Sequence, residues 1–264
     1  RLGKWEGFAA HRGGGAQDGR GGGLGGRETA ISEGTGITEE GKLIPSTAVG
    51  NNQVFIDCAR EVILEVNYYQ PLELEGMHEV YEPALPPNVQ PIMILKPSDR
   101  IGTPYLTWPP EKIKAIVETN HPDRTTVFKE PDADSKAISG HILDFFQNEV
   151  KKGRLPKNLL PLQSGVGNVA NAVLAGLAGG PFEALTAYTE VIQDGLLDLL
   201  RSGSMTFASA TAFSLTAEGA ACLAATAADS PQRVGLRPQG IRTAPGLVLR
   251  PRCTAVDRHG DRPG

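Results

Sequence analysis

The stretch Leu-Leu-Pro-Leu-Gln-Ser-Gly-Val-Gly-Asn-Val-Ala-Asn-Ala-Val, residues 159–173, decides the fold of this chain. Its first residues are apolar and predict a buried strand, whereas its last residues are small and predict a helix. The glycine turn between them, Ser164 to Gly167, opens directly into that helix. Consecutive backbone N–H groups and the positive end of the helix then converge on one point, which favours a bound anion. We therefore expect a phosphorylated ligand at this turn.

A single carboxylate ends the next apolar segment. Residues 185–189 predict a second short strand, and Glu190 follows at its C-terminal tip. Open α/β sheets place their chemistry at the carboxyl ends of their strands, so Glu190 is a candidate functional residue. Strands and helices alternate with short connections along residues 112–208. This alternation predicts an α/β fold with open, mostly parallel sheets.

The glycine turn also fits a dinucleotide-binding pattern. Gly165 to Ala170 reads G-x-G-x-x-A, and Glu190 lies roughly 20 residues further on, where such folds keep the acid that binds a ribose. An NAD-dependent oxidoreductase is therefore a remote alternative. Short glycine patterns also occur at other phosphate sites and at packing turns, and the sequence offers no candidate site for a hydride-accepting substrate.

Longer strings around both features resemble one family. They read Arg-Leu-Pro-Lys-Asn-Leu-Leu-Pro-Leu-Gln-Ser-Gly-Val-Gly-Asn, residues 154–168, and Tyr-Thr-Glu-Val-Ile-Gln-Asp-Gly-Leu-Leu-Asp, residues 188–198. Both are similar to the acetyl-CoA hydrolase/transferase family of class I CoA-transferases. The resemblance runs from about Ala30 to about Glu218 and leaves out the two ends of the chain. Segments 37–41, 46–50, 63–67, 99–102 and 140–146 also share it.

The resemblance implies a nucleophile and a coenzyme A site. The family's nucleophilic glutamate corresponds to Glu190, and the family's CoA-binding loop corresponds to residues Gln163, Ser164, Gly165, Val166, Gly167 and Asn168. The implied activity is that of an acetyl-CoA hydrolase or CoA-transferase in acetate metabolism. Its partners would be acyl-CoA and short-chain carboxylates such as acetate and succinate. Coenzyme A would be a substrate, with no permanently bound cofactor.

One carboxylate is enough for this chemistry. The carboxylate attacks an acyl-CoA thioester to give a mixed anhydride, and the released CoA thiolate attacks the glutamyl carbonyl to leave an enzyme-bound thioester. An acceptor carboxylate reverses these steps, whereas water would hydrolyse the intermediate. The thioester energy is thus conserved without ATP, a metal or a redox cofactor.

Composition narrows the function classes. The 26 basic and 30 acidic residues give a net charge of -4, which favours neither nucleic acid nor an anionic membrane as a partner. The three cysteines, Cys58, Cys222 and Cys253, lack C-x-x-C spacing, which argues against a zinc site or a disulfide framework and suits a reducing compartment. No metal site is expected.

The sequence also predicts a location. It has no apolar run of the roughly 20 residues that cross a bilayer, and residues 1–27 lack the apolar core of a signal peptide. We expect a cytoplasmic protein, although family analogy leaves a mitochondrial location open. Family analogy also leaves open whether the chain forms a homodimer.

Four segments are predicted along the 264 residues. Residues 1–29 are glycine-rich and predicted disordered, and residues 30–125 form a partial N-terminal CoA-transferase domain. Residues 126–218 form the first part of the C-terminal domain, with the CoA loop and the nucleophile, and residues 219–264 are a degenerate or irregular tail. The family has a half-domain upstream and glycine-rich loops downstream that are not matched here. A truncated, inactive relative that keeps only part of the fold is therefore the main alternative.

Local patterns place the remaining elements. A hairpin is predicted in residues 37–44, helices in 51–60 and 193–203, and strands in 61–66, 112–118 and 205–208. The clearest helix is 134–152, whose apolar stripe is predicted to be buried, with His141 packed beside it. Residues 75–110 are proline-rich and predict a long surface connection, in which His78 is predicted to be exposed.

Overall fold

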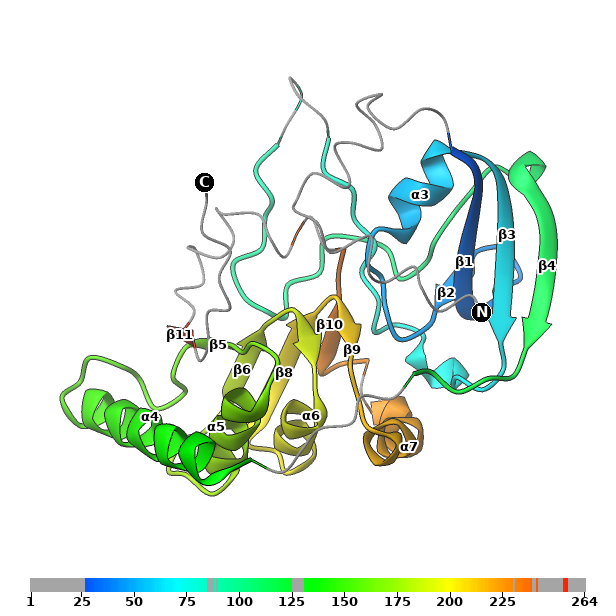
Figure 1. Cartoon of the computed structure of the whole chain (residues 1–264). Coiled ribbons are helices and arrows are strands. Elements are labelled where there is room, and N and C mark those ends of the chain that lie inside the picture. Colours follow the sequence, from blue (N-terminus) through cyan, green and yellow to red (C-terminus); the bar gives the residue numbers. More distant parts are fainter. Residues whose placement is uncertain are drawn as a thin grey trace.

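The computed structural model describes residues 27–84, 88, 90–124, 131–229, 231–238, 241 and 254–255. The predicted glycine-rich segment up to residue 26 and most of the predicted tail beyond residue 238 lie outside the described residues. The described part contains two larger sheets of mostly parallel strands with flanking helices (Figure 1). The structure therefore confirms the predicted α/β class with open, mostly parallel sheets.

The first sheet has the strand order β2-β1-β3-β4. Its strands are β1 (Arg27–Ile37), β2 (Leu43–Pro45), β3 (Ala59–Asn67) and β4 (Ile113–Thr119). Only β2 runs antiparallel to its neighbour, and the N–H of Gly41 donates to the carbonyl of Thr38 in the turn before it, which confirms the predicted hairpin. β1 starts slightly ahead of the predicted domain start at residue 30, because residues 27–29 already pair with β3.

One face of this sheet is packed over β1 and β3, whereas the other face is open and β4 is largely exposed on both faces. Helix α3 (Asn52–Cys58) packs against β1 and β3, and the alternate residues Val62, Leu64 and Val66 of β3 are buried. Ile31 of β1 and Val117 of β4 lie on the opposite face, and each side chain is almost half exposed. Among the described residues, nothing covers this apolar face fully.

The second sheet has the order β10-β8-β6-β5-β11, and all of its pairings are parallel. Its strands are β5 (Pro161–Gln163), β6 (Leu185–Tyr188), β8 (Met205–Ala210), β10 (Val234–Leu236) and β11 (Thr254–Ala255). Two short strands, β7 (Val191–Ile192) and β9 (Ala212–Phe213), form a separate parallel pair. The helices are α4 (Ala133–Lys151), α5 (Asn168–Ala178), α6 (Asp194–Arg201) and α7 (Ala217–Thr226).

Helix α4 agrees with its predicted ends but not with its predicted buried stripe. Asp132 caps it by accepting from the N–H of Ser135 at 2.8 Å. Phe146 is buried, but Ile138 and Phe145 are 45% and 56% exposed, and His141 is exposed rather than packed. The reason is that α4 packs on α5 along a different line, where the missing side chain of Gly176 leaves room for Leu143 and Ser139.

Residues 75–110 were predicted to form a connection along the surface, but this connection is partly buried among the residues that the structure describes. His78 forms a bridge with Leu236 of β10, and the N–H of Leu236 donates to the carbonyl of Met77 at 2.8 Å. His78 is therefore buried, which corrects the prediction of an exposed histidine. Pairing with a strand more than 150 residues away decided its burial, and local sequence carried no sign of that pairing.

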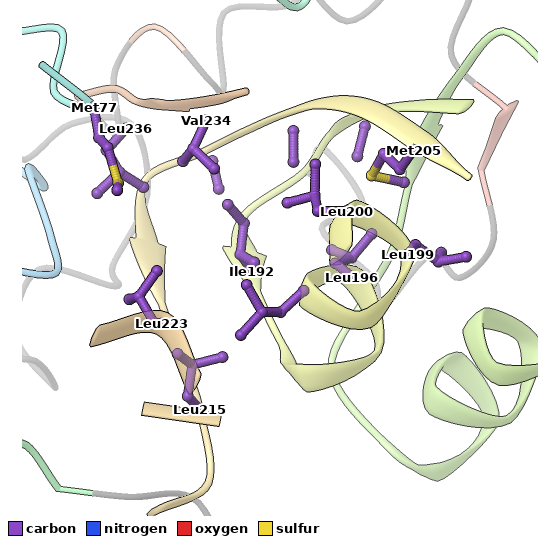
Figure 2. Close-up of a cluster of buried hydrophobic side chains, with 14 of the residues drawn as sticks. Met77, Ile192, Leu196, Leu199, Leu200, Met205, Leu215, Leu223, Val234 and Leu236 are labelled. Atoms are coloured by element: carbon purple, nitrogen blue, oxygen red, sulfur yellow. The ribbon is translucent and has the colours of Figure 1, made fainter. Parts of the chain in front are cut away.

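The apolar core joins both sheets through this connection. Figure 2 shows part of it, where Met77 lies beside Leu236 and the leucines of α6 lie near Met205, Ile192 and Val234. These leucines are Leu196, Leu199 and Leu200. None of the helices described here is long and apolar enough to cross a bilayer.

Candidate active site

The glycine turn forms the predicted strand-turn-helix unit. β5 ends at Gln163, and α5 begins at Asn168, with Gly167 as the residue that precedes the helix. Gly167 has φ 141° and ψ 179°, a backbone conformation that is open essentially to glycine alone. No side chain among the described residues caps α5, so its N-terminal end keeps the character of an anion site.

The six residues of this loop differ in exposure. Ser164 is buried, Val166 is exposed, and Gln163, Gly165, Gly167 and Asn168 are half-buried. The side-chain amide of Gln163 donates to the carbonyl of Ser164 at 3.4 Å. The loop therefore has a fixed inner end at Ser164 and an accessible outer part that a ligand can reach.

Glu190 lies at the same edge of the sheet as the loop. β5 and β6 are parallel neighbours, with Leu162 opposite Ala187, so the residues that follow both strands emerge side by side. The side chain of Glu190 is exposed. Its carbonyl accepts from both the N–H and the hydroxyl of Thr211, each at 2.8 Å. The structure thus brings together the predicted nucleophile and the predicted loop.

Thr189 makes the connection between them. Its buried hydroxyl donates to the carbonyl of Ser164 at 2.6 Å and accepts from the N–H of the same residue at 3.3 Å. Its own N–H donates to the carbonyl of Ser209 on β8 at 2.8 Å. Sequence reasoning missed Thr189, although its place opposite Ser164 follows from counting both strands forward from their pairing.

Two further polar residues near Glu190 were also missed. Thr211 is the single residue between β8 and β9, and its carbonyl accepts from the N–H of Val49 at 3.0 Å. Gln193 follows β7 and is buried, and neither its amide nitrogen nor its amide oxygen has a hydrogen-bond partner in the described part of the chain. Burial of an unsatisfied amide is costly, and a pattern search has no signal for it.

Asp194, which follows Gln193, has a structural role. Its carboxylate accepts from the hydroxyl of Thr216 at 2.6 Å and from the N–H of Thr216 at 3.1 Å. The hydroxyl of Thr216 in turn accepts from the N–H of Gly219 at 3.1 Å and so caps α7. The Asp194 carboxylate is therefore committed to joining α6 to α7.

A buried ion pair lies at the same edge, after β10. The guanidinium of Arg237 is 3.4 Å from the carboxylate of Glu79 and 6.0 Å from the ring centroid of Tyr188, two residues before Glu190. Burial lowers the pKa of Arg237, and the negative charge of Glu79 opposes this change. The pair adds a fixed, nearly neutral group behind the strand that carries Glu190.

The carboxyl ends of the first sheet approach the same region through residues 46–50. The hydroxyl of Thr47 donates at 2.5 Å to the carboxylate of Asp123, which follows β4. The carbonyl of Thr47 accepts from the N–H of Phe213 on β9. Nearby, the amide of Asn67 donates to Glu33 at 2.8 Å. Burial raises the pKa of Glu33, whereas the hydrogen bond from Asn67 opposes this effect. Glu190 therefore lies close to the junction of the two sheets.

Within the described ranges, no group of three His, Cys, Asp or Glu side chains is arranged to hold a metal ion. Neither Cys58 nor Cys222 forms a disulfide in the described part of the chain. What the site does contain is an exposed carboxylate beside a loop that precedes a helix. This combination can support attack by a carboxylate on a ligand whose anionic part is held at the helix end.

Curated proteins that are similar to this chain have names that fit this chemistry. The chain is 46% identical over 223 residues to a succinyl-CoA:acetate CoA-transferase from Clostridium kluyveri, covering 84% of this chain and 41% of that protein. The chain is therefore similar to acetyl-CoA hydrolases and CoA-transferases. It is 42% identical over 230 residues to an acetyl-CoA hydrolase from Schizosaccharomyces pombe, covering 87% of this chain and 44% of that protein. The chain thus spans less than half the length of these curated relatives. No family model matches the chain.

Solved structures support the fold. RipA from Yersinia pestis superposes with a TM-score of 0.66 at 19% identity, over 92% of this chain and 48% of that protein. A 4-hydroxybutyrate CoA-transferase from Porphyromonas gingivalis gives a TM-score of 0.63 at 18% identity, over 93% of this chain and 54% of that protein. At this identity the likeness concerns the arrangement of the elements alone.

Proposed function

We propose that this chain carries the nucleophile and the CoA loop of an acetyl-CoA hydrolase or CoA-transferase that acts on short-chain acids such as acetate and succinate. The observation that supports this most directly is the link from Ser164 through Thr189 to Glu190. This link joins residue 189 to the loop that leads into α5, and the next residue, Glu190, has an exposed side chain. The names of the relatives supply the substrate class.

In the proposed reaction, the carboxylate of Glu190 attacks the thioester carbonyl of an acyl-CoA, and the carbon–sulfur bond breaks to release CoA thiolate. The thiolate then attacks the glutamyl carbonyl of the mixed anhydride, which releases the free acid and leaves a glutamyl-CoA thioester. A second carboxylate reverses both steps and leaves as a new acyl-CoA. Water in its place would release CoA and regenerate the carboxylate of Glu190.

The loop residues Gln163 to Asn168 would hold CoA, with its anionic part at the N-terminus of α5. Backbone N–H groups there attract negative charge, and the free outer residues allow access. We expect weak binding, because this chain spans less than half the length of its curated relatives, while the ligand still loses its freedom of motion. Cys58 and Cys222 form no disulfide within the described residues, which is compatible with a reducing, cytoplasmic location that we also propose.

The decisive experiment traps the intermediate. The chain is incubated with acetyl-CoA or succinyl-CoA and treated with borohydride, which reduces a glutamyl thioester to an alcohol and changes the mass of the peptide that contains Glu190. Turnover and labelling should both disappear in Glu190→Gln. Glu183→Gln is the matched control, since Glu183 is also exposed but lies before β6, at the amino end of the strand.

Two results would contradict the proposal. One is turnover that persists in Glu190→Gln, and the other is a reduced residue that maps to a different peptide. A folded chain that shows neither turnover nor labelling with any short acyl-CoA would favour the alternative that it keeps part of the fold without activity. That alternative is supported by its span of 41–44% of the relatives.

A further inference from the structure

We propose that Thr189 is a positioning residue that couples occupation of the CoA loop to the placement of Glu190. This inference rests on the proposed function, because it assigns Glu190 as the nucleophile. It adds a residue whose role is to keep the loop and the nucleophile in a fixed relation. Thr189 itself is buried, and its hydroxyl is hydrogen-bonded to the backbone of Ser164.

The first argument is the position of Thr189 relative to the backbone pairing of β5 and β6. The pairing ends at Leu162 and Ala187, two residues before Ser164 and Thr189. Beyond that point the two chains would be free to separate. The hydroxyl of Thr189 instead binds both backbone polar groups of Ser164, at 2.6 Å to the carbonyl and at 3.3 Å to the nitrogen. A side chain thus continues a pairing that the backbone has ended.

The second argument is that the other side of Glu190 is fixed as well. Thr211 donates to the carbonyl of Glu190 through its N–H and its hydroxyl, each at 2.8 Å. The N–H of Thr189 is held by Ser209 at 2.8 Å. The backbone of residues 189 and 190 is therefore attached to the loop on one side and to the end of β8 on the other.

These contacts make the coupling mechanical. A threonine has a restricted χ1 angle, so its hydroxyl follows the backbone that carries it. A ligand that shifts or orders Ser164 will act directly on Thr189, and the next residue is Glu190. Attack on a thioester needs the reacting atoms about 3–3.5 Å apart, and a misplacement of about 1 Å can reduce the rate a hundredfold.

The test uses Thr189→Val, which keeps the shape and removes the hydroxyl, and Thr189→Ser, which keeps the hydroxyl. We expect Thr189→Val to lower kcat about tenfold to a hundredfold while KM for acyl-CoA changes less than about threefold. Thr189→Ser should recover kcat to within about threefold of the unchanged chain. A residue that only holds the sheet together would not separate kcat from KM in this way.

Thr206→Val is the matched control. The hydroxyl of Thr206 donates to the carbonyl of Leu185 at 3.2 Å, so it joins neighbouring strands at their amino ends, away from the loop. It should leave kcat and KM unchanged. Thr211→Val is a second variant for the case in which Thr189→Val does not fold. It keeps the N–H donor to Glu190 and should lower kcat by a smaller factor than the loss of Thr189.

Amide hydrogen exchange provides a readout that does not need turnover. CoA should slow exchange in residues 164–168 and in residues 190–192, and Thr189→Val should keep the first effect and lose the second. Equal kcat in Thr189→Val and Thr206→Val, or protection of 190–192 that survives in Thr189→Val, would overturn the coupling. A chain that binds CoA with both protected segments but shows no turnover would overturn the proposed function and support the coupling.

Discussion

The guanidinium of Arg237 lies 3.4 Å from the carboxylate of Glu79, and each side chain is only 1% exposed. Arg237 follows β10 of the second sheet, whereas Glu79 belongs to the long connection between β3 and β4 of the first sheet. A nitrogen of Arg237 also donates to the carbonyl of Pro97 at 2.7 Å, and Glu79 accepts from the N–H of Gly102 at 3.2 Å. The pair therefore fixes the connection to the edge of the sheet that carries Glu190.

Loss of either partner should be strongly destabilising. Arg237→Met leaves the charge of Glu79 buried, and Glu79→Gln leaves that of Arg237, so each should lower the free energy of unfolding by about 3–5 kcal/mol. The double variant should lose less than the sum. Urea unfolding measures all three. Lys114→Met is the control, because its pair with Glu61 is exposed (62% and 47%) and should contribute below about 1 kcal/mol. Additive losses would contradict the pairing.

His78 should make the stability depend on pH. Burial lowers the pKa of its imidazole to about 4, against the hydrogen bond that its Nε2–H donates to Ser46 at 2.7 Å, and the charge of Arg100 lowers the pKa further. The unfolded chain takes up this proton near the ordinary pKa of about 6.5. The contribution of His78 to the free energy of unfolding is therefore complete above pH 6.5 and is lost as the pH falls towards 4. Between pH 7.5 and pH 5 the loss should be about 2 kcal/mol.

Urea unfolding at these two pH values checks this expectation. His78→Gln should be less stable than the unchanged chain at pH 7.5 but should lose about 2 kcal/mol less on going to pH 5. His141→Gln is the matched control, because His141 is exposed on α4 and its replacement should leave the pH dependence intact. The same pH dependence in both variants would show that His78 is not the responsible group.

Gly219 tests the junction of α6 and α7. A Cβ atom there would collide with the carboxylate of Asp194. This carboxylate is held in place by the N–H and the hydroxyl of Thr216, which both donate to it. Gly219→Ala should therefore destabilise the chain by about 1–3 kcal/mol. Gly140→Ala in α4 meets open space and should stabilise the chain by about 0.5–1 kcal/mol. Thermal unfolding of both variants compares them, and a stabilising effect of Gly219→Ala would refute the close contact.

Local signals explain which parts of the molecule the sequence could predict. The unit formed by β5, the glycine turn and α5 follows from adjacent residues, and so does the place of Glu190 at the end of β6. The start of α4 was predictable because Asp132 precedes the helix and lies three residues before Ser135, whose N–H it accepts from. These features depend on neighbours in sequence, which a pattern contains.

Long-range contacts explain the rest. The buried state of His78 depends on Leu236 and Ser46, and the contact face of α4 depends on the space that Gly176 leaves on α5. The role of Thr189 needs the register between β5 and β6, which places it opposite Ser164. Apolar periodicity identifies a helix, but it does not say which neighbour the helix meets.

The last prediction concerns Gly167, whose φ of 141° shapes the loop before α5. A Cβ atom at Gly167 meets nothing within 4 Å, so Gly167→Ala acts only through the backbone. We expect about 1–3 kcal/mol of strain, which the loop relieves by turning its N–H groups away from the ligand. CoA affinity should then fall by about tenfold or more, as measured by calorimetry.

Gly203→Ala provides the comparison. Gly203 follows α6 with φ 80°, and its Cβ would also meet nothing within 4 Å, so this change should lower stability by about 1–2 kcal/mol. It lies after the end of α6, at the amino end of β8, and should leave CoA affinity unchanged. If both variants lost affinity equally, the effect would be one of general stability. If Gly167→Ala bound CoA as well as the unchanged chain, the ligand would not contact this loop, because the strained residue would then have no influence on it.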